Sequence, residues 1–149
     1  MQISSMSVKG HVSVEVVHDD GRRETISQNN VVTNVGRNQF AALIAQDSST
    51  FPGWIAIGTG TAAADVTDTT LGAEVDRNAL VLDTSSAGVI TYKAFFSKSE
   101  ANGNTIAEVG LLDAASSGNL FCRSILSSTV AKASSISLNI TWTITLADA

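Results

Sequence analysis

The chain has 149 residues and a net charge of −5, and only 15% of its residues are charged, which is well below the usual quarter. Its Lys and Arg residues form no extended run, which argues against nucleic acid as a partner and against a basic membrane-binding surface. No apolar stretch approaches the length that crosses a bilayer, and the chain length fits a single domain over residues 1–149.

The first predicted elements form a β-hairpin. Valines alternate with polar residues over 8–17, and a period of two is typical of a half-buried strand. The segment 18–21 ends in Asp-Gly, which supplies the positive φ of a tight turn. Residues 22–28 are predicted to return as the second strand, and the polar residues 1–7 are predicted to form a flexible N-terminal arm.

The hydrophobic period becomes helical after Asn34. Phe40 and Ile44 lie four residues apart among several alanines, which favour a helix. Asn34 is a suitable N-cap, and the segment 47–53, rich in Ser and Thr and closed by Pro-Gly, ends the helix. The sequence therefore predicts one short helix near residues 35–46.

The rest of the chain is predicted to form short strands joined by turns. A strand over 54–57 precedes a long loop over 58–70, one helical turn over 71–77, and strands over 78–83, 89–97, 105–112, 120–126 and 136–146. Clusters of Ser, Asn and Gly separate most of these strands. Many short strands at regular spacing indicate a mainly β fold, namely an antiparallel β-sandwich or a barrel-like sheet.

The last strand carries the clearest pattern in the chain. Its apolar residues, among them Ile140 and Trp142, alternate with Ser, Asn and Thr from residue 136 to residue 146. The apolar face is predicted to be buried. The polar face carries only hydroxyls and one amide, whereas a merely solvated face would usually include Lys or Glu.

Two features near residue 60 suggest ligand sites at first sight. The segment 58–61 reads Gly-Thr-Gly-Thr, but it lacks the lysine and the following helix of a phosphate-binding loop, so a tight turn or strand exit is favoured. Asp65, Asp68 and Glu74 could hold a hard cation, but their spacing is looser than that of known calcium loops. Loop solubility and helix capping by Asp68 are therefore the favoured roles.

The sequence offers little for catalysis. His11 is predicted on the exposed side of a strand and His18 in a turn, and no nucleophile-elbow motif is present. Glu100 and Glu108 lie on different elements without a supporting motif. Cys122, the only cysteine, is interpreted as a small buried hydrophobe. The chain is therefore predicted to be no enzyme, and no catalytic, cofactor-binding or metal-binding residue is assigned.

Four charged residues lie closest to the apolar strands. Arg77, Glu108, Arg123 and Lys132 are predicted to pair at sheet edges or at a subunit boundary. Charges at a sheet edge also protect that edge from unwanted strand pairing.

The chain from about residue 29 to residue 146 resembles a module of tailed-bacteriophage structural and tail-appendage proteins. The resemblance rests on six segments in order. These are Asn-Asn-Val-Val-Thr-Asn-Val-Gly at 29–36, Ile-Gly-Thr-Gly at 57–60, Asp-Thr-Thr-Leu at 68–71 followed by Glu74 and Arg77, Ile-Ala-Glu-Val-Gly-Leu-Leu at 106–112, Asn-Leu-Phe-Cys-Arg at 119–123 and Trp-Thr-Ile-Thr-Leu at 142–146. No catalytic residue belongs to this pattern. The chain has no coiled coil or shaft repeat, unlike a long fibre protein.

The resemblance implies a virion protein assembled in the bacterial host cytoplasm. A capsid decoration (cement) protein that binds the major capsid protein or other virion subunits is the leading hypothesis, and a homotrimer is the predicted assembly. The alternatives are a small tail, collar, baseplate or fibre component and a carbohydrate-binding module. The carbohydrate hypothesis requires an exposed aromatic platform, and the chain has few aromatic residues.

Overall fold

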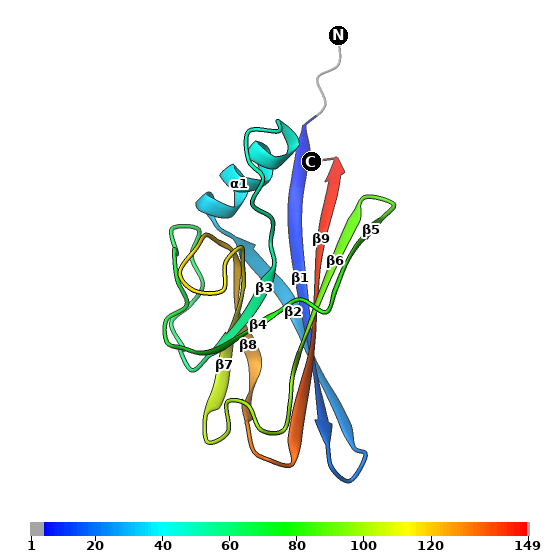
Figure 1. Ribbon diagram of the computed structural model, residues 1–149, viewed down its shortest axis with the longest axis vertical. Coiled ribbons are helices and arrows are strands. Elements are labelled where there is room, and N and C mark those ends of the chain that lie inside the picture. Colours follow the sequence, from blue (N-terminus) through cyan, green and yellow to red (C-terminus); the bar gives the residue numbers. More distant parts are fainter. Residues whose placement is uncertain (1–4, 149) are drawn as a thin grey trace.

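The computed structural model describes residues 5–148, which form a curled antiparallel sheet with one helix (Figure 1). The strands are β1 Met6–His18, β2 Arg23–Val32, β3 Trp54–Gly58, β4 Glu74–Ala79, β5 Leu82–Ser86, β6 Val89–Phe96, β7 Thr105–Leu112, β8 Leu120–Ala131 and β9 Ile136–Asp148. The helix α1 spans Asn34–Ile44. The predicted mainly β fold with one short helix is thus confirmed.

The nine strands lie in one sheet in the order β4-β3-β7-β8-β2-β1-β9-β6-β5. Strand β2 joins the two halves of the sheet, because residues 23–30 pair with β1 whereas Val31 and Val32 pair with β8. Strands β1 and β9 pair over their whole length, from Met6 opposite Asp148 to His18 opposite Ile136. The ends of the described chain therefore lie side by side (Figure 1).

The two edge strands of the sheet, β4 and β5, are consecutive in the chain. Only Leu80 and Val81 separate them, so the sheet must curl until its two edges nearly meet. Asn78 on β4 closes part of this seam, since its Nδ2 donates to the Phe95 carbonyl on β6 and to the Glu100 carboxylate. The result is a barrel-like sheet with one incomplete seam.

Helix α1 begins at Asn34, one residue before the predicted start at residue 35. Thr33, not Asn34, is the N-cap, because the buried Thr33 hydroxyl accepts from the Gly36 amide at 2.9 Å and donates to the Leu120 carbonyl at 2.6 Å. Gly36 lets the helix approach β8 closely, since a Cβ there would lie 2.1 Å from the Phe121 carbonyl oxygen. Phe40 then packs edge-on against the Phe121 ring at 5.0 Å.

Two other predicted elements are wrong. The segment 71–77 forms no helical turn, because β4 pairs with β3 from Glu74 onward and draws these residues into the sheet. The predicted strand over 78–83 is divided between β4 and β5, because the chain crosses from one sheet edge to the other at residues 80–81. Strand β1 already begins at Met6, within the predicted arm, and residues 1–4 of that arm lie outside the described residues.

The core lies inside the curl and includes the apolar face of β9. Trp142 is 0% exposed and Ile140 is 1% exposed, as the alternation predicts. The Trp142 indole also donates to the Asn30 Oδ1 at 3.0 Å. Gly10 leaves room for that Asn30 side chain, because a Cβ at Gly10 would lie 2.0 Å from the same oxygen.

Candidate interaction surface

A buried ion pair lies between strands β7 and β8. The Glu108 carboxylate is 0% exposed and contacts the guanidinium of Arg123, which is also buried, at 3.1 Å. The two charges pair, as predicted, but the predicted location at a sheet edge or a subunit boundary is wrong, because β7 and β8 are inner strands of the sheet and both residues are buried. The alternation of residues along β7 could not predict the burial of Glu108, because β7 is buried on both faces over most of its length.

The loop after β3 folds over this ion pair and hides it. Glu108 accepts hydrogen bonds from the backbone amides of Gly60 at 2.6 Å, Gly72 at 2.7 Å and Ala73 at 2.7 Å. Burial by itself disfavours the charged carboxylate, but these amides and Arg123 outweigh it and lower the pKa of Glu108. Glu108 is thus an ionised carboxylate, and its oxygens accept hydrogen bonds from groups inside the fold.

Arg123 completes the attachment of the loop. Its guanidinium donates to the carbonyls of Ala62 and Ala63 and pairs with Asp68 at 2.9 Å. Asp68 therefore caps no helix, contrary to the prediction, but links the loop to β8. The glycines of the 58–61 segment are required by the close approach, since a Cβ at Gly60 would lie 2.2 Å from Glu108 Oε2. The predicted strand exit is confirmed.

The three carboxylates considered for a cation have separate partners. Asp68 binds Arg123, Glu74 pairs with Arg77, and Asp65 accepts from the backbone and hydroxyl of Thr67. Hydrogen bonds from Thr67 lower the pKa of Asp65. Among residues 5–148, no three His, Cys, Asp or Glu side chains gather as metal ligands would.

The other two charged residues predicted at a sheet edge, Arg77 and Lys132, lie in different environments. Arg77 does lie on the edge strand β4, where it pairs with Glu74 and donates to the carbonyls of Ala114 and Ser117 at 2.8 Å. Lys132 is buried instead, with its ammonium 2.9 Å from Asn102 Oδ1. Burial lowers the pKa of Lys132, while Glu100 and Asp76 act in the opposite direction.

The residues considered for catalysis do not come together. His11 lies exposed on β1 beside Asn29, and His18, at the end of β1, contacts Glu24 at 3.3 Å. Glu100 accepts from the Ser97 amide in the turn after β6 and from Asn78, and it shares none of these partners with Glu108. Cys122 is buried, as predicted, and burial raises the pKa of its thiol to about 12.

The candidate interaction surface is the outer face of the sheet around β9. On β9 this face carries the buried Ser137 and the more exposed Asn139, Thr141, Thr143 and Thr145. Strand register extends the face into three rows across the neighbouring strands, namely Thr25-Glu15-Asn139-Phe95, Ser27-Ser13-Thr141-Lys93-Leu82 and Asn29-His11-Thr143-Thr91-Thr84. We call these residues the outer rows. Hydroxyl and amide groups dominate them, and their charges lie beside β9 rather than on it.

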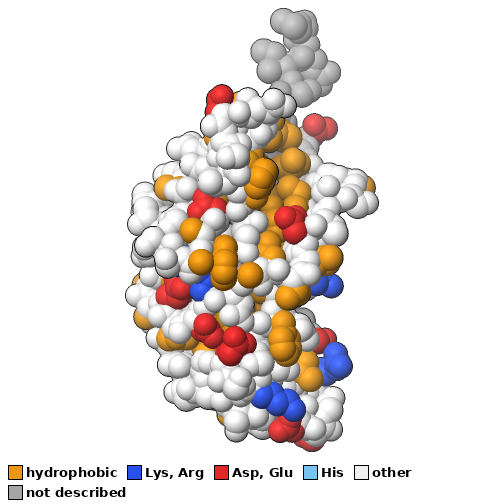
Figure 2. Space-filling model, viewed as in Figure 1, with side chains coloured by type: hydrophobic (Ala, Val, Ile, Leu, Met, Phe, Trp, Pro, Cys, Tyr) orange, Lys and Arg blue, Asp and Glu red, His pale blue; other side chains and the backbone are white. Residues whose placement is uncertain are grey.

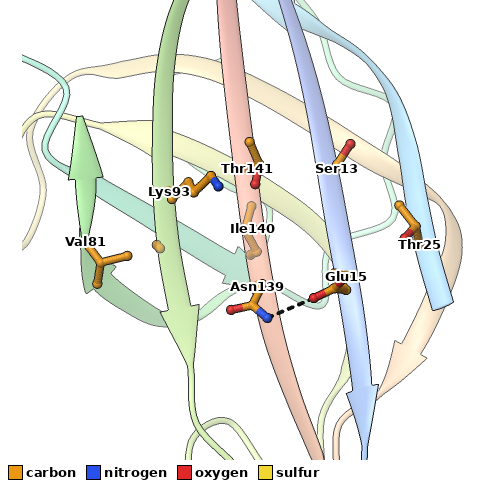
Figure 3. Close-up of a pocket in the computed structure, with 9 residues that line it drawn as sticks. Ser13, Glu15, Thr25, Val81, Lys93, Asn139, Ile140 and Thr141 are labelled. Carbon is orange, nitrogen blue, oxygen red and sulfur yellow. Dashed lines mark hydrogen bonds between the residues drawn. The ribbon is translucent and has the colours of Figure 1, made fainter. Parts of the chain in front are cut away.

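A shallow hollow of about 400 Å³ lies in this surface (Figure 3). Polar side chains from β1, β2, β6 and β9 surround it, including Ser13, Thr25, Lys93 and Thr141. The Asn139 amide donates to Glu15 at 3.1 Å, and Arg23 pairs with the same carboxylate at 3.2 Å. The one formal anion of the outer rows therefore already has partners within the chain.

Exposed apolar side chains accompany the polar surface at one margin. Val81 is 70% exposed, Leu82 is 38% exposed and Phe95 is 43% exposed. Figure 2 shows a further band of apolar side chains along the middle of another face, between the helix and the strands of the β9 half. Val8, Ile90 and Leu146 are among the partly buried apolar residues that pack against the core.

No protein-family model, no curated protein and no solved structure matches this chain. Within the described residues, no helix is both long enough and apolar enough to cross a membrane.

Proposed function

We propose that this protein is a structural component of a tailed-bacteriophage virion, assembled in the host cytoplasm, that docks on other virion subunits as a decoration or cement protein. The observation that carries the proposal is the set of outer rows, a wide sheet face with an uncharged strand at its centre. Interface cores are depleted in charge relative to the rest of a protein surface. The sequence resemblance supports the same class of protein.

The buried charges strengthen this interpretation. Glu108, Arg123 and Lys132 lie inside the fold. The surface therefore carries fewer charged side chains than the composition of the chain suggests. Polar but uncharged groups cost less to dehydrate than ions, and they form hydrogen bonds to almost any partner backbone. Such a face suits an assembly in which many copies each make a modest contact and bind only the assembled particle.

A carbohydrate-binding role has less support. Both tryptophans contribute to the body of the fold, with Trp142 fully buried and Trp54 half-buried on β3. The exposed aromatic side chains of the described chain are Phe51 and Phe95, and Phe95 alone belongs to the outer rows. A stacking platform built from one phenylalanine would be small.

The direct test mixes purified protein with virus particles that lack it. We expect saturable binding and a higher temperature of particle disruption. Thr143→Arg places a cation at the centre of the outer rows and should weaken binding at least tenfold. Thr105→Arg, on the exposed start of β7, is the matched control and should bind as the unmodified protein does.

Two outcomes would count against the proposal. If the unmodified protein fails to bind particles, the decoration role is lost and a tail, collar or baseplate component becomes the better hypothesis. If both variants bind equally well, docking occurs through another surface than the outer rows.

A further inference from the structure

The two edges of the sheet are protected to very different degrees. Edge strand β4 is mostly half-buried, and its Arg77 and Asn78 side chains bind neighbouring loops and β6. Edge strand β5 is exposed at all five of its residues and pairs only with β6 among the described strands. It contains no Lys or Pro, which commonly block strand addition, and its one charged residue is Asp83.

The direction of the backbone groups of β5 follows from the β5–β6 hairpin. Its two-residue turn, Ala87-Gly88, has positive φ at both positions, which is the type I′ geometry in which the flanking residues Ser86 and Val89 exchange hydrogen bonds. On the other side of β6, the Leu146 amide donates to the Gly88 carbonyl, so the even-numbered residues of β6 face β9. By alternation, Asp83 and Ser85 direct their N–H and C=O groups away from β6, toward the free edge.

We propose that β5 is a docking edge for a second copy of this chain, with the two β5 strands antiparallel about a two-fold axis at Thr84. In this register Asp83 lies opposite Ser85 of the second copy, and each pair exchanges two backbone hydrogen bonds. The Thr84 side chains of the two copies meet on the outer face of the sheet, and paired threonines stabilise such cross-strand contacts.

Charge selects this register over the alternatives. A two-fold axis at Asp83 would place two carboxylates directly opposite each other, which is destabilising. An axis at Ser85 would place Asp83 beyond the end of the partner strand, opposite Ala87 in the turn. Only the axis at Thr84 uses both outward-facing residues of each strand and gives every Asp83 a hydroxyl neighbour.

The contact also places exposed apolar surface at the new boundary. Leu82 lies in the same strand, and Val81 precedes it directly. Five residues per strand make a small interface compared with stable dimers, so the expected association is weak. A two-fold contact closes with two copies, which favours a dimer over the trimer predicted from the sequence. The inference does not depend on docking to a virion.

Cysteine cross-linking tests the register directly. Thr84 of each copy would face its own counterpart at a non-hydrogen-bonded position, where Cβ atoms come within about 5 Å, close to the reach of a disulfide. Thr84→Cys should therefore form a disulfide-linked dimer under mild oxidation, at least tenfold faster than Ser86→Cys, whose counterpart in the second copy is Leu82. Cys122 is buried and serves as an internal negative control in the unmodified protein.

Mass measurement in solution provides the second arm. The unmodified protein should shift from one copy to two as its concentration rises to about 1 mM. Thr84→Lys should weaken this association at least tenfold, whereas Ser27→Lys, exposed on the same face at β2, should leave it unchanged. Ser85→Pro, at a residue outside the outer rows, removes one N–H that faces the free edge of β5. It should weaken the association and leave particle binding unchanged, so that failure of particle docking and failure of this contact are distinguishable.

Several results would overturn the inference. A single-copy mass at every concentration, a three-copy mass that Thr84→Lys leaves intact, or equal cross-linking of Thr84→Cys and Ser86→Cys would each do so.

Discussion

The loop-covered ion pair and the outer rows place polar groups in opposite ways. Glu108 and Arg123 are charged and buried, and each already has several partners inside the fold. The β9 residues of the outer rows are uncharged, and their side chains point away from the core. This chain therefore uses its strongest electrostatic contacts to hold a loop and leaves weaker hydrogen-bonding groups on its surface.

If the inner face of β9 holds the fold together while the outer face is free for partners, substitutions on the two faces must differ. Trp142→Ala removes a fully buried side chain and its hydrogen bond to Asn30, and should lower the free energy of unfolding by about 4 kcal/mol. Thr141→Ala, one residue earlier on the outer face, should change it by less than about 0.5 kcal/mol. Denaturant unfolding measures both. Similar values for the two variants would show that the faces are not distinct.

The buried Glu108 and the more exposed Glu15 should also differ in how much each contributes to stability. Glu108→Gln keeps the shape of the side chain but leaves Arg123 with a smaller compensating charge, so it should destabilise the protein by about 3 kcal/mol. Glu15→Gln, an acidic residue of the outer rows, is the matched control and should cost less than about 1 kcal/mol. A loss of stability in Glu15→Gln as large as in Glu108→Gln would contradict the assigned roles.

The close packing of α1 on β8 can be tested at Gly36. Gly36→Ala forces a methyl group against the Phe121 carbonyl and should destabilise the fold by about 2 kcal/mol. Gly53→Ala is a suitable control, because the nearest atom to its added Cβ is 3.8 Å away. Thermal melting of the two variants distinguishes them, and equal melting temperatures would show that the helix does not rest on β8 as described.

Acid should weaken the loop-covered half through Glu108. Its pKa is lowered in the folded protein, so between that pKa and the ordinary value of about 4.3 the unfolded chain binds more protons. Stability is therefore present above the ordinary carboxyl pKa and is lost as pH falls through the folded value. Glu100, whose pKa is also lowered, adds to the same trend. Stability curves from pH 7 to pH 3 should fall less steeply in Glu108→Gln, and an unchanged slope would rule out this carboxylate as a major cause.

Local sequence patterns predicted where the strands lie in the chain better than they predicted which strands pair with each other. The alternation in β1 and β9 predicted which residues are buried, because side-chain direction in a strand follows from position alone. The same alternation could not predict that β9 pairs with β1 from the opposite end of the chain, so the outer rows were visible only on one strand. The Glu108 site was missed because its partners, Gly60, Gly72 and Ala73, come from a loop whose path depends on tertiary packing.

Cap and boundary errors have the same origin. Asn34 and Thr33 are both acceptable N-caps by residue type, and the choice follows from the burial of Thr33 against β8. The division between β4 and β5 reflects the curl of the sheet rather than any turn residue, since Leu80 and Val81 are both apolar. The Glu108–Arg123 pair shows that a charged residue in an apolar strand need not mark an edge.

The salt dependence of particle binding tests the central claim most directly. The outer rows would bind other virion subunits through uncharged groups, and contacts between such groups are not screened by ions. Affinity for particles that lack the protein should therefore change by less than about twofold between about 0.01 M and about 1 M salt, a range over which the screening length falls from about 30 Å to about 3 Å. A loss of affinity of tenfold or more over that range would show that charged residues carry the contact and would contradict the account.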